Sequence, residues 1–253
     1  MKLWTTLVTR LRTLAGRNKL VVESYDWLCL LYTILVKDLL NLRKNIRKVK
    51  LILAVKPYTL LGLPRISALY ELACQLERER RSGNFVECGV CNGGSAAIVS
   101  LVAKHNINRH VWLFDSWEGM PEPGERDYTY DLKPGKKGMA LASEERVKEL
   151  LFTRFQLDSS RVHLAKGWFE DTLPGAQIGT IALLHLDCDW YESVKFCLEQ
   201  LYDDVINGGF IVIDDYGHWK GCKEAVDEFV KSRNLKVELI KVDYTGVYFQ
   251  KET

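Results

Sequence analysis

The chain has 253 residues, 47% of them hydrophobic and 27% charged, so it can bury a full-sized core in one large domain. The longest uncharged apolar run, residues 27–36, falls short of the roughly 20 residues that a membrane-spanning helix needs. The net charge is +2, but residues 1–56 hold 12 Lys and Arg against 3 acidic residues, so a basic segment of +9 precedes a body of −7.

The basic segment, residues 1–56, is predicted to be helical and distinct from a main domain of residues 57–253. From Trp27 to Val55, apolar residues alternate with Lys and Arg in a pattern typical of amphipathic helices. Two hypotheses fit. The helices cap the main domain or pair with a second subunit in a homo-oligomer, or they make peripheral contact with an anionic membrane surface. No nucleic-acid partner is expected, because aromatic residues are not interleaved with the charges.

The number and positions of the cysteines indicate the redox state of the compartment in which the protein is expected. There are seven, an odd number, and several lie in segments that are predicted to be buried. This favours a reduced, cytoplasmic protein, with any membrane contact at the inner face. Arg10 and Arg12 interrupt the apolar start of the chain, so no signal peptide is predicted. Cys88 and Cys91 form a C-x-x-C pair, but no second pair completes a zinc site, which disfavours a metal or redox centre there.

After Pro57 the chain alternates between helical and extended patterns. A helix through residues 66–76 precedes the first strand, and further helices are expected over 96–102, over 191–205 and in the stretch that follows Ser143, a predicted cap. The loop 118–138 is long and rich in Gly, Pro and charge, as in a lid. Five apolar strands are predicted, at 84–90, 110–116, 162–166, 181–186 and 210–213. Because their hydrophobic runs are continuous, they suit a parallel sheet that is covered on both faces.

The end of the body has a different pattern. After a helix over 222–232, strands over 236–242 and 247–250 are joined by a tight turn, so they must be antiparallel. The predicted fold is therefore α/β: a doubly wound, mostly parallel, seven-stranded sheet with a C-terminal antiparallel hairpin, preceded by a helical segment. This Rossmann-like arrangement is typical of class I methyltransferases.

Ligands of doubly wound sheets bind beyond the carboxyl ends of the strands. The spacing of the glycines after the first strand is G-x-x-x-G-G, unlike the dinucleotide fingerprint. Asp115, at the end of the second strand, is placed to accept hydrogen bonds from ribose hydroxyls, and Trp168 or Phe169 can pack on an adenine. The predicted cofactor-binding residues are Glu87, Gly89, Gly93, Ser95, Asp115, Ser116, Gly167, Trp168 and Phe169.

The fourth and fifth strands each end in a pair of acidic residues. Asp187 and Asp189 follow the fourth strand, and Asp214 and Asp215 follow the fifth. Because adjacent parallel strands end at the same edge, these carboxylates converge, and a cation relieves their repulsion. Asp187, Asp214 and Asp215 are predicted to bind Mg²⁺, with Mn²⁺ or Ca²⁺ as alternatives. Asp189 is the predicted general base, and His218 is the second catalytic candidate.

Several motifs together resemble the macrocin O-methyltransferase family. They are Phe85-Val-Glu-Cys-Gly-Val, Gly93-Gly-Ser, Asp115-Ser-Trp-Glu-Gly, Asp171-Thr-Leu-Pro, Leu186-Asp-Cys-Asp-Trp-Tyr-Glu-Ser and Asp214-Asp-Tyr-Gly. The resemblance extends from about residue 60 to the end of the chain. Two departures are Cys91, where such proteins usually have Trp, and Cys188, where they usually have Gly.

The resemblance implies an S-adenosylmethionine-dependent, Mg²⁺-assisted O-methyltransferase that acts on a hydroxyl of a sugar or glycosylated small molecule. It implies the metal ligands and the general base that were predicted from the ends of the fourth and fifth strands. It also implies that the loop 118–138 closes over the substrate. Two alternatives stay open. One is a catechol-type O-methyltransferase that uses a metal ion in the same way. The other is a non-catalytic, membrane-associated protein with a methyltransferase fold.

Overall fold

A seven-stranded sheet forms the centre of the computed structural model, which describes residues 42–252. The strand order is β3-β2-β1-β4-β5-β7-β6; the first five are parallel, β7 runs antiparallel to β5, and β6 runs antiparallel to β7. This topology confirms the predicted fold class. The strands are β1 (Asn84–Cys88), β2 (Val111–Asp115), β3 (Val162–Lys166), β4 (Ile181–Leu186), β5 (Val205–Ile213), β6 (Ile240–Lys241) and β7 (Val247–Gln250).

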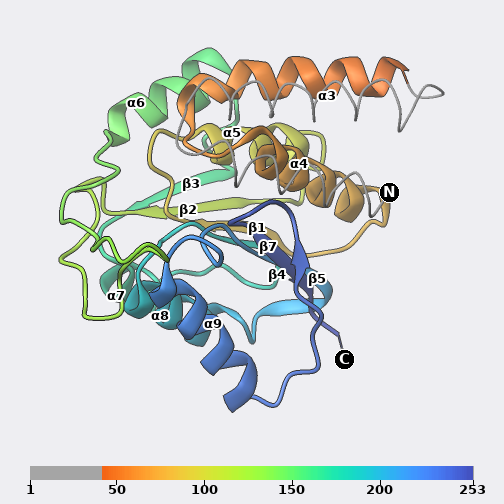
Figure 1. Cartoon of the computed structure of the whole chain (residues 1–253). Coiled ribbons are helices and arrows are strands. Elements are labelled where there is room, and N and C mark those ends of the chain that lie inside the picture. The colour runs from red at the N-terminus through yellow and green to blue at the C-terminus, as the bar shows by residue number, and fades with distance from the viewer. Residues whose placement is uncertain (1–41, 253) are drawn as a thin grey trace.

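Helices cover both faces of this sheet (Figure 1). On one face lie α3 (Leu42–Val55), the short turn η2 (Lys56–Tyr58), α4 (Leu63–Arg78), α5 (Gly94–Ala103), α6 (Glu144–Lys148) and η3 (Glu149–Arg154). On the other face lie α7 (Phe169–Thr172), α8 (Tyr191–Leu201) and α9 (Lys220–Ser232). All six residues of β4 are buried, as the continuous apolar run predicted. The helices cover the two faces of the sheet and leave the carboxyl ends of the parallel strands uncovered.

β1 and β2 differ from the predicted bounds by one or two residues, and two other strands differ by more. β5 begins at Val205, five residues early, and includes a bulge at Asn207-Gly208-Gly209 beside β4. The preceding helix, predicted to reach Val205, ends at Leu201. Gly208 has a φ of +80°, which glycine adopts without strain. β6 covers only Ile240–Lys241, because the side chains of Val237 and Leu239 pack against the core on the α8 and α9 face.

The described part of the basic segment packs against the main domain. Ile52 and Val55 of α3 are fully buried in the same core as α4 and α5, and Lys48 pairs with Glu71 of α4. The helix prediction for residues 42–55 is thus confirmed, and the part of it over 27–41 lies outside the described residues. The division at residue 56 stays a prediction. Between residues 42 and 252, no helix is long and apolar enough to cross a membrane.

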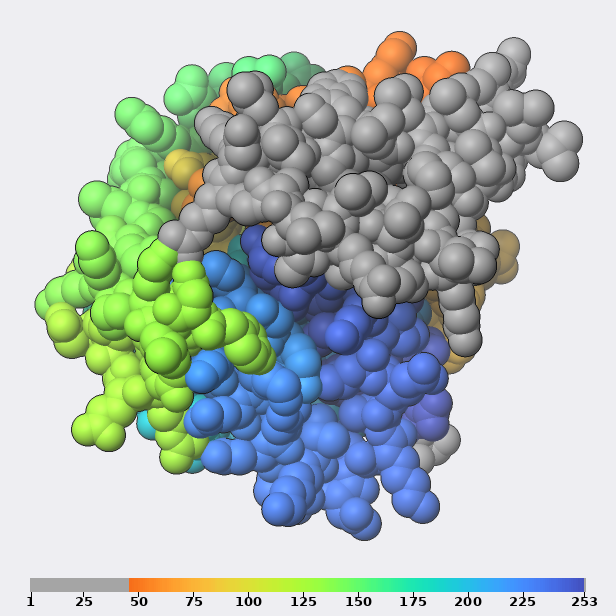
Figure 2. Space-filling view, in the orientation of Figure 1, coloured from red at the N-terminus to blue at the C-terminus, as the bar shows by residue number. Residues whose placement is uncertain are grey.

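The loop predicted as a lid is bonded to the first turns of α8 and α9. Its yellow-green atoms lie beside the blue C-terminal part of the chain in Figure 2. Asp127, which is buried, accepts hydrogen bonds from the backbone N–H groups of Gly124 and Tyr191. Thr129 forms an isolated β-bridge with Trp219. The loop therefore forms one wall of the region beyond the strand ends.

Ser143 precedes α6, as predicted, but it does not cap the helix through its side chain. Its hydroxyl donates to the Glu145 carboxylate, at 2.7 Å, and only its backbone carbonyl accepts a helical hydrogen bond. The nearby acidic side chain competes successfully for the hydroxyl.

Candidate active site

The glycine-rich turn after β1 is held by Asp115. The Oδ2 atom of Asp115 accepts hydrogen bonds from the backbone N–H groups of Val90, at 2.7 Å, and Cys91, at 2.8 Å, and Oδ1 accepts one from Trp117. Gly89 has a φ of +90°, and a Cβ there would lie 1.9 Å from the carbonyl oxygen of Asp187. Only glycine therefore fits between the ends of β1 and β4.

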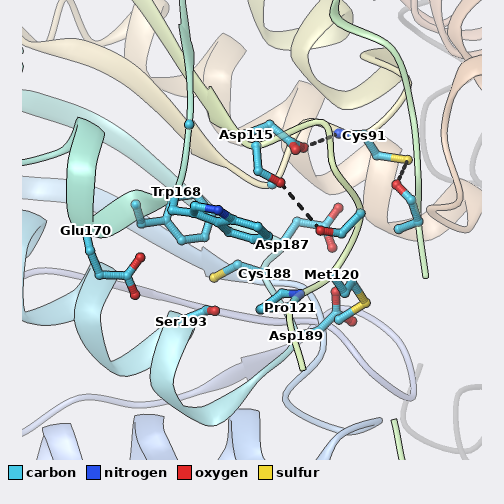
Figure 3. A pocket seen from close by; sticks show the side chains of 16 residues that line it. Cys91, Asp115, Met120, Pro121, Trp168, Glu170, Asp187, Cys188, Asp189 and Ser193 are labelled. Atoms are coloured by element: carbon cyan, nitrogen blue, oxygen red, sulfur yellow. Dashed lines mark hydrogen bonds between the residues drawn. The ribbon is translucent and has the colours of Figure 1, made fainter. Parts of the chain in front are cut away.

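A first cavity opens beyond the ends of β1, β2, β3 and β4 (Figure 3). Asp115, Trp168, Asp187 and Cys188 surround it in that view. Six of the nine predicted cofactor-binding residues line it: Gly89, Asp115, Ser116, Gly167, Trp168 and Phe169. An acidic side chain, glycines and aromatic rings thus share one cavity at the topological switch point of the sheet, which is where such folds bind ligands.

The other three predicted cofactor-binding residues do not line this first cavity. Glu87 is buried inside β1, where its carboxylate accepts a hydrogen bond from the hydroxyl of Ser95 and lies 3.5 Å from Nδ1 of His185. Gly93 precedes α5 with a left-handed backbone, and a Cβ there would meet Val147. Glu87 and Gly93 thus shape the turn from within.

The strand-end carboxylates meet as predicted. One oxygen each from Asp187, Asp214 and Asp215 lies within 4.8 Å of the others, and these three residues are called the acidic cluster below. Burial raises the pKa of Asp187 well above its ordinary value, and the charges of Asp214 and Asp215 raise it further. Burial likewise raises the pKa of Asp214, to about 6, although Arg65 opposes this shift. The cluster therefore concentrates negative charge that a cation would stabilise.

A second cavity adjoins the first at the acidic cluster. It contains all three cluster residues and both predicted catalytic residues, Asp189 and His218. The two cavities share Cys91, Met120, Ala140, Asp187 and Asp189. Two ligands, one in each cavity, would therefore face each other at these residues.

The family described as Macrocin-O-methyltransferase (TylF) matches residues 36–251. Demethyldecarbamoylnovobiocin O-methyltransferase of Streptomyces niveus is 35% identical over 199 residues, which cover 77% of this chain and 76% of that protein. A tetracenomycin 4'-O-methyltransferase of Streptomyces olivaceus, named for its dimethoxyrhamnosyl substrate, is 34% identical over 198 residues, or 76% of this chain and 75% of that protein. The solved O-methyltransferase NovP, at 34% identity, has a TM-score of 0.71 and covers 78% of this chain and 83% of its own.

The chain belongs to the macrocin O-methyltransferase family. Family membership and the class I methyltransferase fold confirm that the protein is an S-adenosylmethionine-dependent O-methyltransferase.

Several residues around the second cavity of this macrocin O-methyltransferase were not predicted. Arg65 of α4 forms an ion pair with Asp214, and Met120, Met139 and Ala140 of the long loop contribute apolar walls. No local sequence pattern indicates that Arg65 belongs to the site, because Arg65 is a single charged residue at the start of an ordinary amphipathic helix. The loop residues had a weak signal in the loop's length alone.

The two departures from the family pattern lie in the walls of the cavities. Cys91 lines both cavities, and its thiol donates to the carbonyl oxygen of Ala140 over 3.6 Å. Cys188 lines the first cavity and is a free thiol. Cys88, the other half of the C-x-x-C pair, is buried and also free. Both replacements thus change the shape of the cavities and leave the acidic cluster intact.

Proposed function

We propose that this enzyme methylates a hydroxyl on the sugar of a glycosylated small molecule, with the help of a divalent cation. The observation that carries the proposal is the position of the acidic cluster, which lines the second cavity and reaches the boundary with the first through Asp187. The relatives support a sugar acceptor, since the Streptomyces olivaceus enzyme is named for a rhamnosyl substrate. The class of aglycone is left to experiment.

The first cavity is proposed to bind S-adenosylmethionine. Trp168 and Phe169 offer aromatic faces for the adenine, and the glycine turn permits close backbone approach. Asp115 already accepts three backbone N–H groups through its two oxygens, which have about four acceptor positions in all. A contact between this carboxylate and a ribose hydroxyl would use the remaining capacity. Glu87 would then act indirectly, through the turn, whereas Ser95 lines the second cavity and donates its hydroxyl to Glu87.

The acidic cluster is proposed to bind Mg²⁺ or Mn²⁺. The residues fit such an ion, because three carboxylates converge within 4.8 Å and hard oxygen donors suit these cations. Burial and the neighbouring carboxylates raise the pKa of Asp187, which supports a cation at this position. A divalent ion held here would lower the pKa of an acceptor hydroxyl and orient it.

Asp189 is proposed to be the general base. It lines both cavities but is not one of the three converging carboxylates, so it is placed to take a proton without binding the ion. His218 lines the second cavity, with its ring against that of Trp219. It is proposed to donate or accept a hydrogen bond at the acceptor sugar.

Calorimetry and methyl-transfer assays test these proposals. S-adenosylmethionine binding is expected with or without Mg²⁺, whereas transfer to a panel of glycosides should be lost in EDTA and in Asp187→Asn. If catechols and not glycosides are methylated, the catechol-type alternative replaces the sugar acceptor. If transfer survives both EDTA and Asp187→Asn, the metal proposal fails while the methyltransferase assignment stands.

The role of the basic segment is a separate proposal. In its described part, the basic side chains of Arg47 and Lys50 are exposed on α3, together with the apolar side chains of Ile46 and Leu53. Such a surface suits either a second subunit or an anionic membrane at the inner face of a cell. Co-sedimentation with liposomes decides between them: binding that does not depend on anionic lipid content contradicts the membrane proposal.

A further inference from the structure

Arg65 reaches from the first turn of α4 to the edge of the acidic cluster. Its Nη1 donates a hydrogen bond to Oδ2 of Asp214, and its Nε lies 3.2 Å from Oδ2 of Asp243, in the turn before β7. The side chains of Arg65, Asp214 and Asp243 are 13%, 4% and 3% exposed. The guanidinium thus lies between two buried carboxylates, of which only Asp214 belongs to the acidic cluster.

The contact with Asp243 is incomplete. Arg65 Nε and Asp243 Oδ2 are both buried without a hydrogen-bond partner, although they are close enough for an ion pair. Asp243 is itself held in place, because its Oδ1 accepts hydrogen bonds from the backbone N–H groups of Thr245, at 2.9 Å, and Gly246, at 2.8 Å. A small shift of the guanidinium toward Asp243 would complete the missing hydrogen bond. Asp243 therefore offers the guanidinium a second carboxylate partner beside Asp214.

The charge of Arg65 is secure in either position. Burial lowers the pKa of Arg65, but the carboxylates of Asp214 and Asp243 outweigh burial and raise that pKa above its ordinary value. The stem of the side chain packs against Gly246, where a Cβ would lie 2.9 Å from Arg65 Cδ, so the guanidinium is kept beside both carboxylates. A permanent positive charge is thus confined to the rim of the acidic cluster.

We propose that Arg65 is a built-in counter-ion of the metal site, which neutralises Asp214 in the metal-free enzyme and moves toward Asp243 when a divalent cation binds. This inference rests on the proposed metal function of the acidic cluster. The pairing stabilises the metal-free enzyme, because one of the three crowded carboxylates keeps a partner when no ion is present. The same pairing weakens cation binding, since the ion must displace a positive charge from one of its own ligands.

Two variants should change cation affinity in opposite directions. Arg65→Met removes the charge at similar length, so Mn²⁺ should bind on the order of tenfold more tightly, while the metal-free protein unfolds at a lower temperature. Asp243→Asn keeps the oxygen that binds the turn but removes the second partner of Arg65. Its guanidinium should then stay on Asp214, and Mn²⁺ should bind more weakly than to the wild type. Affinity is measured by calorimetry or electron paramagnetic resonance with Mn²⁺ alone, and stability by thermal denaturation in EDTA.

Arg109→Met is the matched control. Arg109 is more deeply buried than Arg65, with 1% of its side chain exposed against 13%, and pairs with Glu77. It donates to the carbonyl oxygen of Gly83, just before β1, at the opposite end of the parallel strands from the acidic cluster. Its loss should therefore lower stability with and without Mn²⁺ and leave the affinity unchanged. Arg65→Lys keeps the charge and is the variant to use if Arg65→Met does not fold. Its Mn²⁺ affinity should stay close to that of the wild type. An unchanged Mn²⁺ affinity in Arg65→Met, or in Asp243→Asn if Arg65→Met does not fold, overturns the counter-ion role while leaving the metal site intact. Failure of the wild type to bind Mn²⁺ would instead remove the metal site, and the counter-ion with it.

Discussion

The indole Nε1 of Trp219 donates a hydrogen bond of 2.7 Å to Oδ1 of Asp189. Asp189 has a left-handed backbone, with a φ of +56°, so its carboxylate depends on such contacts for its direction. Trp219 packs edge-on against Trp190, with ring centroids 4.8 Å apart, and Trp190 Nε1 donates to the carbonyl oxygen of Pro121. The two indoles therefore connect the proposed base with the long loop.

Trp219→Phe tests this positioning. The substitution removes the donor to Asp189 and keeps an aromatic ring against Trp190, so kcat should fall roughly tenfold while the KM for the acceptor changes little. Trp190→Phe, which loses the contact with Pro121 instead, should act mainly on KM. Steady-state kinetics at saturating S-adenosylmethionine provide both values. Equal changes of KM and kcat in Trp219→Phe would indicate a packing role only.

Asp189→Asn tests the base itself. An amide of the same shape cannot accept the proton, so kcat should fall by about 10² to 10⁴. Mn²⁺ and S-adenosylmethionine should bind as in the wild type, because Asp189 is not one of the three converging carboxylates. Calorimetry on the variant checks both ligands. Near-normal turnover would transfer the role to another group, with His218→Ala as the next variant.

The buried carboxyl of Asp214 predicts how the stability of the metal-free enzyme depends on pH. Burial raises the pKa of Asp214 from 3.8 to about 6, so between these values the folded state binds more protons than the unfolded state. The free energy of unfolding therefore falls as pH rises through this interval. Saturating Mn²⁺ should reverse the trend, because the ion requires deprotonated ligands.

Thermal denaturation in EDTA and in Mn²⁺, from about pH 4 to about pH 7, measures this effect. The difference between the wild type and Asp214→Asn isolates the contribution of this carboxyl from those of exposed acidic residues. A metal-free wild type that gains stability relative to Asp214→Asn as pH rises would contradict the prediction.

Gly135→Ala tests the fixed position of the long loop. A Cβ at Gly135 would lie 2.2 Å from Cη2 of the Trp190 ring, so the loop must move away. We expect a loss of stability of roughly 1–3 kcal/mol and a higher KM for the acceptor, because Met139 of the same loop lines the second cavity. Gly175→Ala, where an added Cβ meets nothing within 4 Å, is the control and should be close to neutral in both assays.

Much of the fold and part of the site could be predicted from the sequence. The order of strands and helices followed from the hydrophobic periods, and the bulge at Gly208 was missed because a glycine-rich bulge and a turn have the same local composition. Glu87 was assigned to the cofactor site by its place after the strand core, yet it lies inside β1, with its side chain turned toward Ser95. Strand alternation settles such directions only when the register of the neighbouring strands is known.

The sequence by itself determined that four carboxylates would gather at one edge of the sheet, since parallel strands end on the same side and the acidic pairs stand directly after two of them. Tertiary structure alone decided what surrounds them. Arg65 lies 149 residues before Asp214, and their contact depends on how α4 packs across the sheet. The same holds for Trp219 and Asp189, because a hydrogen bond between side chains of separate elements is set by packing geometry, which no local pattern records.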